Sequence, residues 1–172
     1  FVGISEGRSW SFKGTRYGES LELSQQDTLV LLVNERYKLP ENLYIDQDVF
    51  RLSSSNMIAP SIKIYSTDDT IPTLRVQFYT QEEKPVYDNM DFNWDYKNDT
   101  LRFDNYIKIA RQWRAQRVTL SLYLPENKKV LLPPQTSQYL RNLRDFDWKV
   151  RSKLNKDQIL LIMRDGKLQP LM

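Results

Sequence analysis

The sequence contains neither cysteine nor histidine. Without cysteine, the chain forms no disulfide, thiolate zinc site or iron–sulfur cluster, and it has no thiol nucleophile. Without histidine, it lacks the commonest metal ligand and the side chain that most often shuttles protons near neutral pH. Every Ser–His and Cys–His catalytic arrangement is therefore excluded. We predict that the chain is not an enzyme, that it has no catalytic residue, and that it binds no cofactor or metal.

Glycine and long hydrophobic runs are scarce as well. None of the five glycines lies in a GxGxxG or GxxxxGK[ST] spacing, so the familiar phosphate-binding loops are missing. No apolar run approaches the roughly 18 to 20 residues that span a bilayer, and the N-terminus lacks the basic-then-apolar pattern of a signal peptide. Because the chain begins at Phe1 rather than at methionine, we expect a processed protein or a fragment cut from a longer one.

The composition is otherwise that of a folded protein. Hydrophobic residues make up 40% of the chain, aromatic residues 12% and charged residues 27%, which is ordinary for a chain that buries a core. A chain of 172 residues most economically builds one core. We therefore expect a single domain over residues 1–172.

Charge is distributed unevenly. Residues 1–110 hold 12 Lys and Arg against 17 Asp and Glu, whereas residues 111–172 hold 13 against 5. A basic third of this kind occurs where a protein contacts an anionic partner, and also where a solvated face balances an acidic half. We favour the solvated face. The anionic partners that such a basic third suits are a lipid surface and nucleic acid, and of the two we do not expect nucleic acid.

Alternation with a period of two is the strongest pattern in the chain. In WRAQRVTLSLYLPENKKVLLP, residues 113–133, apolar and polar side chains alternate as in a strand with one buried face. Pro125 cannot donate to a strand ladder and Glu126-Asn127 favours a turn, so the strand should end there. The residues predicted to fill the core are Val118, Leu120, Leu122 and Leu124, and those predicted on the opposite face are Thr119, Ser121 and Tyr123.

Similar patterns recur along the chain, separated by turn-forming residues at short intervals. Only residues 137–150 differ, because apolar residues there have helical spacing after a Ser or Thr that can cap a helix. The sequence therefore predicts a mainly β fold of stacked-strand, solenoid-like or sandwich-like sheets with one short helix near 137–150. The other strands are predicted at residues 10–12, 21–23, 28–33, 43–45, 49–52, 61–65, 73–79, 92–96, 101–103, 130–132 and 159–163.

Two segments of the chain resemble each other. QDTLVLLVNERYKL at residues 26–39 and NDTLRFDNYIKI at residues 98–109 both open with Asp-Thr-Leu and continue to a tyrosine. Such an echo is expected of duplicated rungs in a solenoid. It also arises by chance, since a polar residue followed by Thr-Leu is a common start for a strand.

The acidic and aromatic segment YDNMDFNWDYKNDT, residues 87–100, is the first candidate binding site. Its Asp-x-Asn-x-Asp run at 91–95 has the spacing that opens an EF-hand loop, but Tyr96 replaces the glycine and Arg102 the glutamate. As a strand, the segment would bury its aromatic residues and leave its acids in solvent, which is the interpretation we favour. The alternative is a calcium site on one of two acids, Asp88 or Asp91.

Carboxylate pairs are the second candidate site. The chain has 22 acidic residues, and two carboxylates on either side of a sugar can hydrolyse a glycosidic bond. No spacing singles out a pair, however, so we expect solvated charges rather than a hydrolase.

The basic C-terminal third supplies the third candidate site. Cationic residues interleaved with aromatic ones suit an anionic surface or single-stranded nucleic acid. The alternative is that the aromatic residues pack inward while the charges keep the surface soluble. The candidate partner contacts are Arg141, Arg144, Lys149, Arg151, Lys153 and Lys156.

Residues 92–109 and 113–132 carry a distinctive combination of motifs. They are Asp99-Thr100-Leu101, Tyr106, Trp113-Arg114 with Gln116, Leu122-Tyr123-Leu124-Pro125 and Lys129-Val130. In this combination the chain resembles the C-terminal extracytoplasmic domain of phage-shock-protein-C-type membrane proteins of Gram-negative bacteria. Residues 7–31 are similar to the opening of that domain. The chain departs from the family at Asn127, where glycine is usual.

The resemblance implies a β-rich, solenoid-like domain, similar to adhesin heads, displayed outside the cytoplasmic membrane and tethered to it in the full-length protein. It implies a role in envelope-stress sensing or regulation that is performed by contacts, with a protein partner in the envelope or by self-association, rather than by catalysis. The alternative is a binding module for glycans or anionic surfaces, with aromatic platforms beside the basic tail.

Overall fold

The computed structural model describes residues 8–9, 16–36, 57–79, 90–109, 117–141 and 156–171. These residues form β-strands and one 3-10 helix, η1 (Pro134–Tyr139). The strands are β1 (Arg8–Ser9), β2 (Arg16–Glu22), β3 (Thr28–Asn34), β4 (Met57–Ile58), β5 (Ser61–Ser66), β6 (Thr73–Tyr79), β7 (Met90–Asp91), β8 (Asn93–Lys97), β9 (Thr100–Asp104), β10 (Ile107–Ile109), β11 (Arg117–Leu124), β12 (Lys129–Leu132), β13 (Ile159–Arg164) and β14 (Lys167–Pro170).

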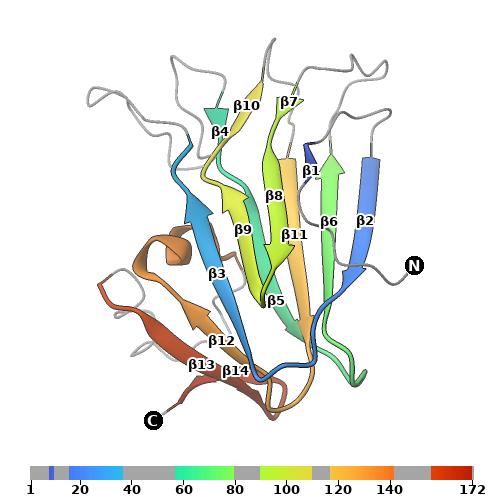
Figure 1. The fold of residues 1–172 in the computed structure, drawn as a ribbon, viewed down its shortest axis with the longest axis vertical. Helices are drawn as coiled ribbons and strands as arrows, with labels where there is room; N and C mark the ends of the chain where they lie inside the picture. Colours follow the sequence, from blue (N-terminus) through green and yellow to red (C-terminus); the bar gives the residue numbers. More distant parts are fainter. Residues whose placement is uncertain are drawn as a thin grey trace.

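The strands make three sheets (Figure 1). The largest has seven strands in the order β1-β8-β9-β3-β12-β13-β14, and a second has four in the order β2-β6-β11-β5. A small third sheet has the order β4-β10-β7. Its strands adjoin β5, β9 and β8 along the chain, at the end of the molecule away from the β5–β6 turn. The chain crosses from the four-stranded to the seven-stranded sheet at the β2–β3 turn and again at the β11–β12 turn. The fold is mainly β with stacked strands, as predicted.

The core lies between the four-stranded and seven-stranded sheets, because buried residues of both belong to one hydrophobic cluster. The strand predicted at 118–124 is the central strand β11, paired with β5 on one side and β6 on the other. Its four predicted core residues are at most 1% exposed, which confirms the assignment of its faces. Ser121 on the opposite face is nevertheless buried, since the long side chains of Lys63 and Arg75 flank it in register.

The segment with EF-hand-like spacing is a strand, as we favoured. Phe92, Trp94 and Tyr96 are at most 2% exposed, and the intervening polar residues point away from the core. Strand β8 then turns into β9 through Asn98 and Asp99, which both have positive φ angles, 52° and 56°. Two successive residues in this conformation are typical of the tight hairpin turn that matches the twist of the strands.

The two segments that resemble each other lie side by side. Their strands β3 and β9 pair in parallel within the seven-stranded sheet, and β12 pairs in parallel with the other edge of β3. The register is offset by two residues from the sequence echo, because Val30 rather than Thr28 is opposite Thr100. The echo therefore corresponds to adjacent, similarly directed strands, as in stacked rungs.

The predicted short helix is wrong where the structure describes it. Over residues 137–141 the chain completes η1 and then extends, and Leu140 forms a parallel bridge with Ile62. The Arg141 N–H donates to the Ile62 carbonyl at 2.9 Å. Backbone pairing with the edge of β5 therefore outweighs the local preference of this segment for a helix. Residues 142–150 lie outside the described part of the chain, as do the strands predicted at 10–12, 43–45 and 49–52.

None of the helical segments among the described residues is long and apolar enough to cross a membrane.

Buried tyrosines make the stability of this fold sensitive to alkaline pH. Burial raises the pKa of Tyr96, Tyr106 and Tyr139 above the ordinary value near 10. Above about pH 10 the unfolded chain loses phenolic protons that the folded chain retains. The free energy of unfolding should therefore decrease as pH rises from that value. Burial also lowers the pKa of Lys128 and of Arg141, and these two cations act in the opposite direction.

Urea unfolding at pH 8, 9.5 and 11 checks this expectation. Tyr139→Phe removes the phenol whose pKa is raised most. The free energy of unfolding of this variant should therefore fall less steeply between pH 9.5 and 11 than that of the parent protein. Equal pH slopes for the two proteins would contradict the assignment.

Candidate functional site

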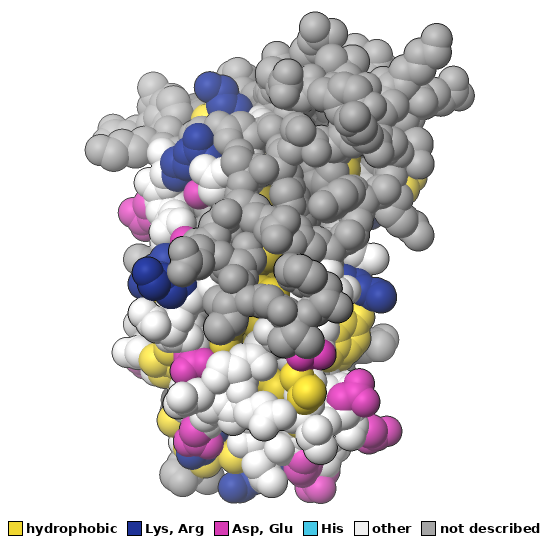
Figure 2. Space-filling model, turned by 45° about the vertical axis from the view of Figure 1, so that its right-hand side comes forward, with side chains coloured by type: hydrophobic (Ala, Val, Ile, Leu, Met, Phe, Trp, Pro, Cys, Tyr) yellow, Lys and Arg dark blue, Asp and Glu magenta, His cyan; other side chains and the backbone are white. Residues whose placement is uncertain are grey.

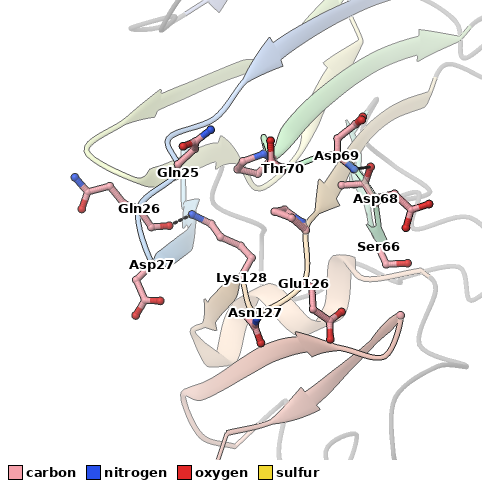
Figure 3. A pocket seen from close by; sticks show the side chains of 14 residues that line it. Gln25, Gln26, Asp27, Ser66, Asp68, Asp69, Thr70, Glu126, Asn127 and Lys128 are labelled. Atoms are coloured by element: carbon pink, nitrogen blue, oxygen red, sulfur yellow. Dashed lines mark hydrogen bonds between the residues drawn. The ribbon is translucent and has the colours of Figure 1, made fainter.

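An open recess of about 590 Å³ lies at one end of the two sheets. We call it the turn-end recess. Four turns line it: β2–β3, β5–β6, β11–β12 and β13–β14 (Figure 3). Because those turns come from both sheets, the recess exists only when the sheets are packed. Its lining residues are Gln25, Gln26, Asp27, Ser66, Thr67, Asp68, Asp69, Thr70, Pro72, Pro125, Glu126, Asn127, Lys128 and Gly166.

Lys128 is a buried cation in the wall of the turn-end recess. It is 6% exposed, and its ammonium group donates to the carbonyl oxygens of Ser24, at 3.2 Å, and of Gln26 (Figure 3). Burial lowers its pKa, while the carboxylates of Asp99 and Asp27 act in the opposite direction. A buried charge is tolerated when it is hydrogen-bonded. Lys128 therefore fixes the β2–β3 turn against the β11–β12 turn.

A tyrosine hydroxyl fixes the same turn from the other side. The Tyr96 hydroxyl accepts the N–H of Ser24 at 2.9 Å and donates to Asp99 Oδ1 at 3.1 Å. Burial is the main reason that the pKa of Tyr96 is raised, and Asp99 adds to the effect. The β8–β9 hairpin, the β2–β3 turn and the β11–β12 turn are thus joined through side-chain hydrogen bonds in the wall of the recess.

The acidic side chains of the turn-end recess serve different partners. Asp27 forms an ion pair with Lys129 at 2.8 Å, and Glu126 accepts the N–H of Asp165 at 3.0 Å. Asp68 and Asp69 are exposed on the β5–β6 turn. Within the described ranges, no group of three or more acidic side chains has the arrangement of a metal site. The recess therefore offers carboxylates, amides, hydroxyls and backbone groups for contacts.

The backbone conformation at Asn127 explains one departure from the resembled family. Its φ angle is 70°, in the left-handed region where glycine is favoured and asparagine is best tolerated among other residues. Its N–H donates to the Met163 carbonyl at 2.7 Å, so the turn is held in this conformation by β13. Asparagine at this position therefore preserves the turn that the usual glycine would form.

The effect of a substitution at Asn127 on stability should depend on how well the new residue tolerates a positive φ angle. Asn127→Gly should leave the free energy of unfolding within about 0.5 kcal/mol of the parent, whereas Asn127→Val should lower it by about 2 kcal/mol. Urea unfolding measures both. Equal stability of the valine and glycine variants would mean that the turn adopts another conformation in solution.

The predicted partner contacts are only partly described. Arg141 donates through Nη1 to the carbonyls of Gln138 at 2.8 Å and Leu140 at 3.2 Å, so its guanidinium secures the end of η1. Lys156 is exposed before β13. Neither residue lines the turn-end recess. The other four contacts, Arg144, Lys149, Arg151 and Lys153, lie outside the described residues, as does Asp88, while only the backbone of Asp91 is described.

Sequence reasoning missed the turn-end recess. Its residues come from four turns that are far apart in the chain, and turn residues are mostly polar in any protein. Lys128 and Lys129 are adjacent in the sequence, and nothing in the sequence shows that the first is buried and the second is not.

The comparisons with known proteins agree with the resemblance found in the sequence. A family model described as "ToastRack found in some PspC" matches residues 46–170. No curated protein and no solved structure gave a significant match. The matched range begins before β4 and ends with β14, so it includes three of the four turns of the recess.

Proposed function

The chain belongs to the toast-rack family found in some PspC proteins, and we infer from this that it is a non-enzymatic domain displayed outside the cytoplasmic membrane. We propose that it acts through contacts with a protein partner, as an envelope-stress sensing or regulatory module. The turn-end recess is the observation that carries the proposal. It is concave, polar and built from turns, which are the segments on which rigid scaffolds usually carry their binding residues.

The hydrogen bonds in the wall of the recess support a role in binding. Lys128 and Tyr96 hold the β2–β3 turn through hydrogen bonds to its backbone. A surface that is already ordered loses less conformational entropy when a partner binds. The rim meanwhile keeps exposed polar groups, including those of Gln25, Asp69 and Thr70. Such a rim is suited to a polar loop or peptide of another protein.

The chemistry of the chain supports a non-enzymatic role. It has no histidine and no cysteine, and the buried ionisable groups beside the recess are already engaged. Lys128 is bound to carbonyls, and Tyr96 is bound to Ser24 and Asp99. Catalytic acids and bases must instead be free to meet a substrate.

Site-specific photo-crosslinking in the full-length protein tests the contact. A photoreactive amino acid at Gln25 or Thr70 lies on the rim of the turn-end recess, and one at the exposed Lys108 of β10 lies at the other end of the strands (Figure 1). In the host cell, the recess positions should give one discrete cross-linked protein whose yield changes under envelope stress. A product of twice the chain mass would identify the partner as a second copy.

The control position decides the outcome. Lys108 should give no such product. The same products from all three positions, or no stress-dependent product from the recess, would contradict the proposal. As a second variant, Thr70→Trp narrows the recess and should reduce both the cross-link from Gln25 and the stress response, while Lys108→Trp should change neither.

The placement outside the cytoplasmic membrane has its own test. Protease added to spheroplasts that carry the full-length protein should degrade this domain while a cytoplasmic marker stays intact. Protection of the domain until the membrane is opened would show that the placement is wrong.

A further inference from the structure

The outward face of the four-stranded sheet combines cations with tyrosines. Along β5, β6 and β11, the outward residues alternate with buried ones, so this face lies opposite the core. It does not overlap with the basic C-terminal residues singled out in the sequence. We call it the tyrosine–cation face, and it consists of Lys63, Tyr65, Arg75, Tyr79, Arg117 and Tyr123.

The strand register arranges this face in rows. Lys63 and Arg75 lie on either side of Ser121, which is the register partner of both. Two inter-strand spacings separate the strands that carry them, about 10 Å. Tyr65 is opposite Tyr123 in the next row toward the turns, so cations and aromatic rings lie in neighbouring rows.

The cations of the tyrosine–cation face form no ion pair with the described residues, although Glu22 of β2 lies on the outward side of the same sheet. The cations that do form ion pairs within the described ranges are Arg36, Arg102 and Lys129. None of these three lies on this face. Arg117 instead places its guanidinium 4.7 Å from the centre of the Tyr79 ring. A cation on an aromatic ring remains able to meet an anion on its open side.

The tyrosines form an exposed aromatic platform. Tyr65 is 37% exposed and stands out as the large hydrophobic side chain that the described surface exposes. Its ring stacks on that of Tyr123, with centroids 5.4 Å apart. Tyrosine has an apolar body and a polar end, so it is favoured at boundaries between apolar and aqueous phases, including the head-group level of membranes.

We propose that the tyrosine–cation face lies against the surface of a bilayer that contains anionic lipids. Basic residues near such a surface are attracted to its head groups within a Debye length, and the stacked tyrosines can enter the interface beside them. The six residues of this face do not line the turn-end recess. Contact through this face would hold the domain with the recess free to meet a protein partner.

Geometry and charge favour a bilayer over a chain-like polyanion. The three cations are spread over a sheet face rather than lined up in a groove, which fits a planar array of head groups. The recess, where a chain could be enclosed, has four acidic residues in its lining and only Lys128 as a cation, and that cation is buried. A soluble acidic polysaccharide would be repelled there.

The acidic end of the molecule sets the orientation. Several acidic side chains gather at the lower end of the molecule in the view of Figure 2. The β5–β6 turn lies at the same end in Figure 1. Asp68 and Asp69 on this turn follow β5 directly and are exposed. They follow Tyr65 by three and four residues, so their charges should repel an anionic surface that lies against its ring. Replacing Asp68 and Asp69 by asparagine should therefore strengthen binding to anionic vesicles. If the two aspartates only stabilised the turn, their replacement would not strengthen it.

Vesicle sedimentation of the 172-residue chain tests the proposal. Vesicles of phosphatidylcholine with one quarter phosphatidylglycerol should bind the chain, and binding should weaken as salt rises, whereas pure phosphatidylcholine should not bind. The variant K63Q/R75Q/R117Q should lower partitioning by about 100-fold. D68N/D69N should raise it. Tyr65→Ala should lower it with no change in net charge.

A charge-matched variant on the other sheet is the control. K97Q/R164Q/K167Q removes three exposed cations from β8, β13 and β14 and should retain most of the binding. Circular dichroism and melting temperature confirm that each variant is folded, and R75Q alone, at an exposed position, serves if the triple variant is not.

Three results would overturn the proposal. They are an equal loss of binding in the two triple variants, equal binding to neutral vesicles, and binding to polygalacturonate but not to vesicles with dependence on the same residues. The last result would identify the ligand as an acidic glycan.

Discussion

Leu120→Ala is expected to lower the free energy of unfolding by about 3 kcal/mol. Leu120 is fully buried at the centre of β11, with Ile62 and Val76 as its register partners on the two neighbouring strands. Truncation removes buried apolar surface and leaves a cavity that strands paired on both sides cannot collapse to fill. Urea unfolding, with the m value compared to that of the parent, measures the loss.

Thr119→Ala is the matched control for this prediction. Thr119 precedes Leu120 on the same strand but faces outward and is partly exposed, so its truncation should cost less than about 1 kcal/mol. Similar losses at the two positions would mean that the two faces of β11 are not distinguished in solution, and the core assignment would fail.

Asp104→Ala should lower the free energy of unfolding by about 3 kcal/mol. Asp104 is 2% exposed, and its Oδ2 atom accepts the Asn93 N–H at 2.7 Å and Arg36 Nη1 at 3.0 Å. One carboxylate thus connects the end of β9 with the start of β8 and with the segment after β3. Removing it leaves a guanidinium and a backbone donor without this acceptor. Thermal and urea unfolding both report the change.

Arg102→Ala provides the comparison for Asp104. Arg102 pairs with Asp95 at 3.8 Å, and their side chains are 41% and 31% exposed, so solvent screens the pair and its loss should cost less than about 1 kcal/mol. A double-mutant cycle between Arg36 and Asp104 would measure their coupling directly. A cost for Asp104→Ala as small as that for Arg102→Ala would show that the buried carboxylate is not a structural acceptor.

The two variants also separate what could be read in advance from what could not. Leu120 was predicted to be a core residue, because strict alternation in one segment fixes which side chains share a face. Asp104 was not distinguished from the other 21 acidic residues. Its burial depends on Asn93 and Arg36, which adjoin it only because β8 and β3 both pair with β9.

The same limit applies to the short helix near 137–150. Spacing at residues 139–143 favoured a helix, but Leu140 instead meets Ile62 on the open edge of β5. Local periodicity describes what a segment can do alone, whereas an unpaired strand edge elsewhere in the chain can provide backbone hydrogen bonds that override it.

The sequence by itself determined the β class, the inward faces of the main strands, the turn positions and, through its motifs, the family. These depend on neighbouring residues, whose alternation and backbone preferences act locally. Only the tertiary structure decided which turns meet at the recess, that Lys128 is buried while Lys129 is not, and that Lys63, Arg75 and Arg117 share one face. Strands pair through backbone N–H and C=O groups that every residue except proline carries in full, so side chains alone do not specify which distant strands become neighbours.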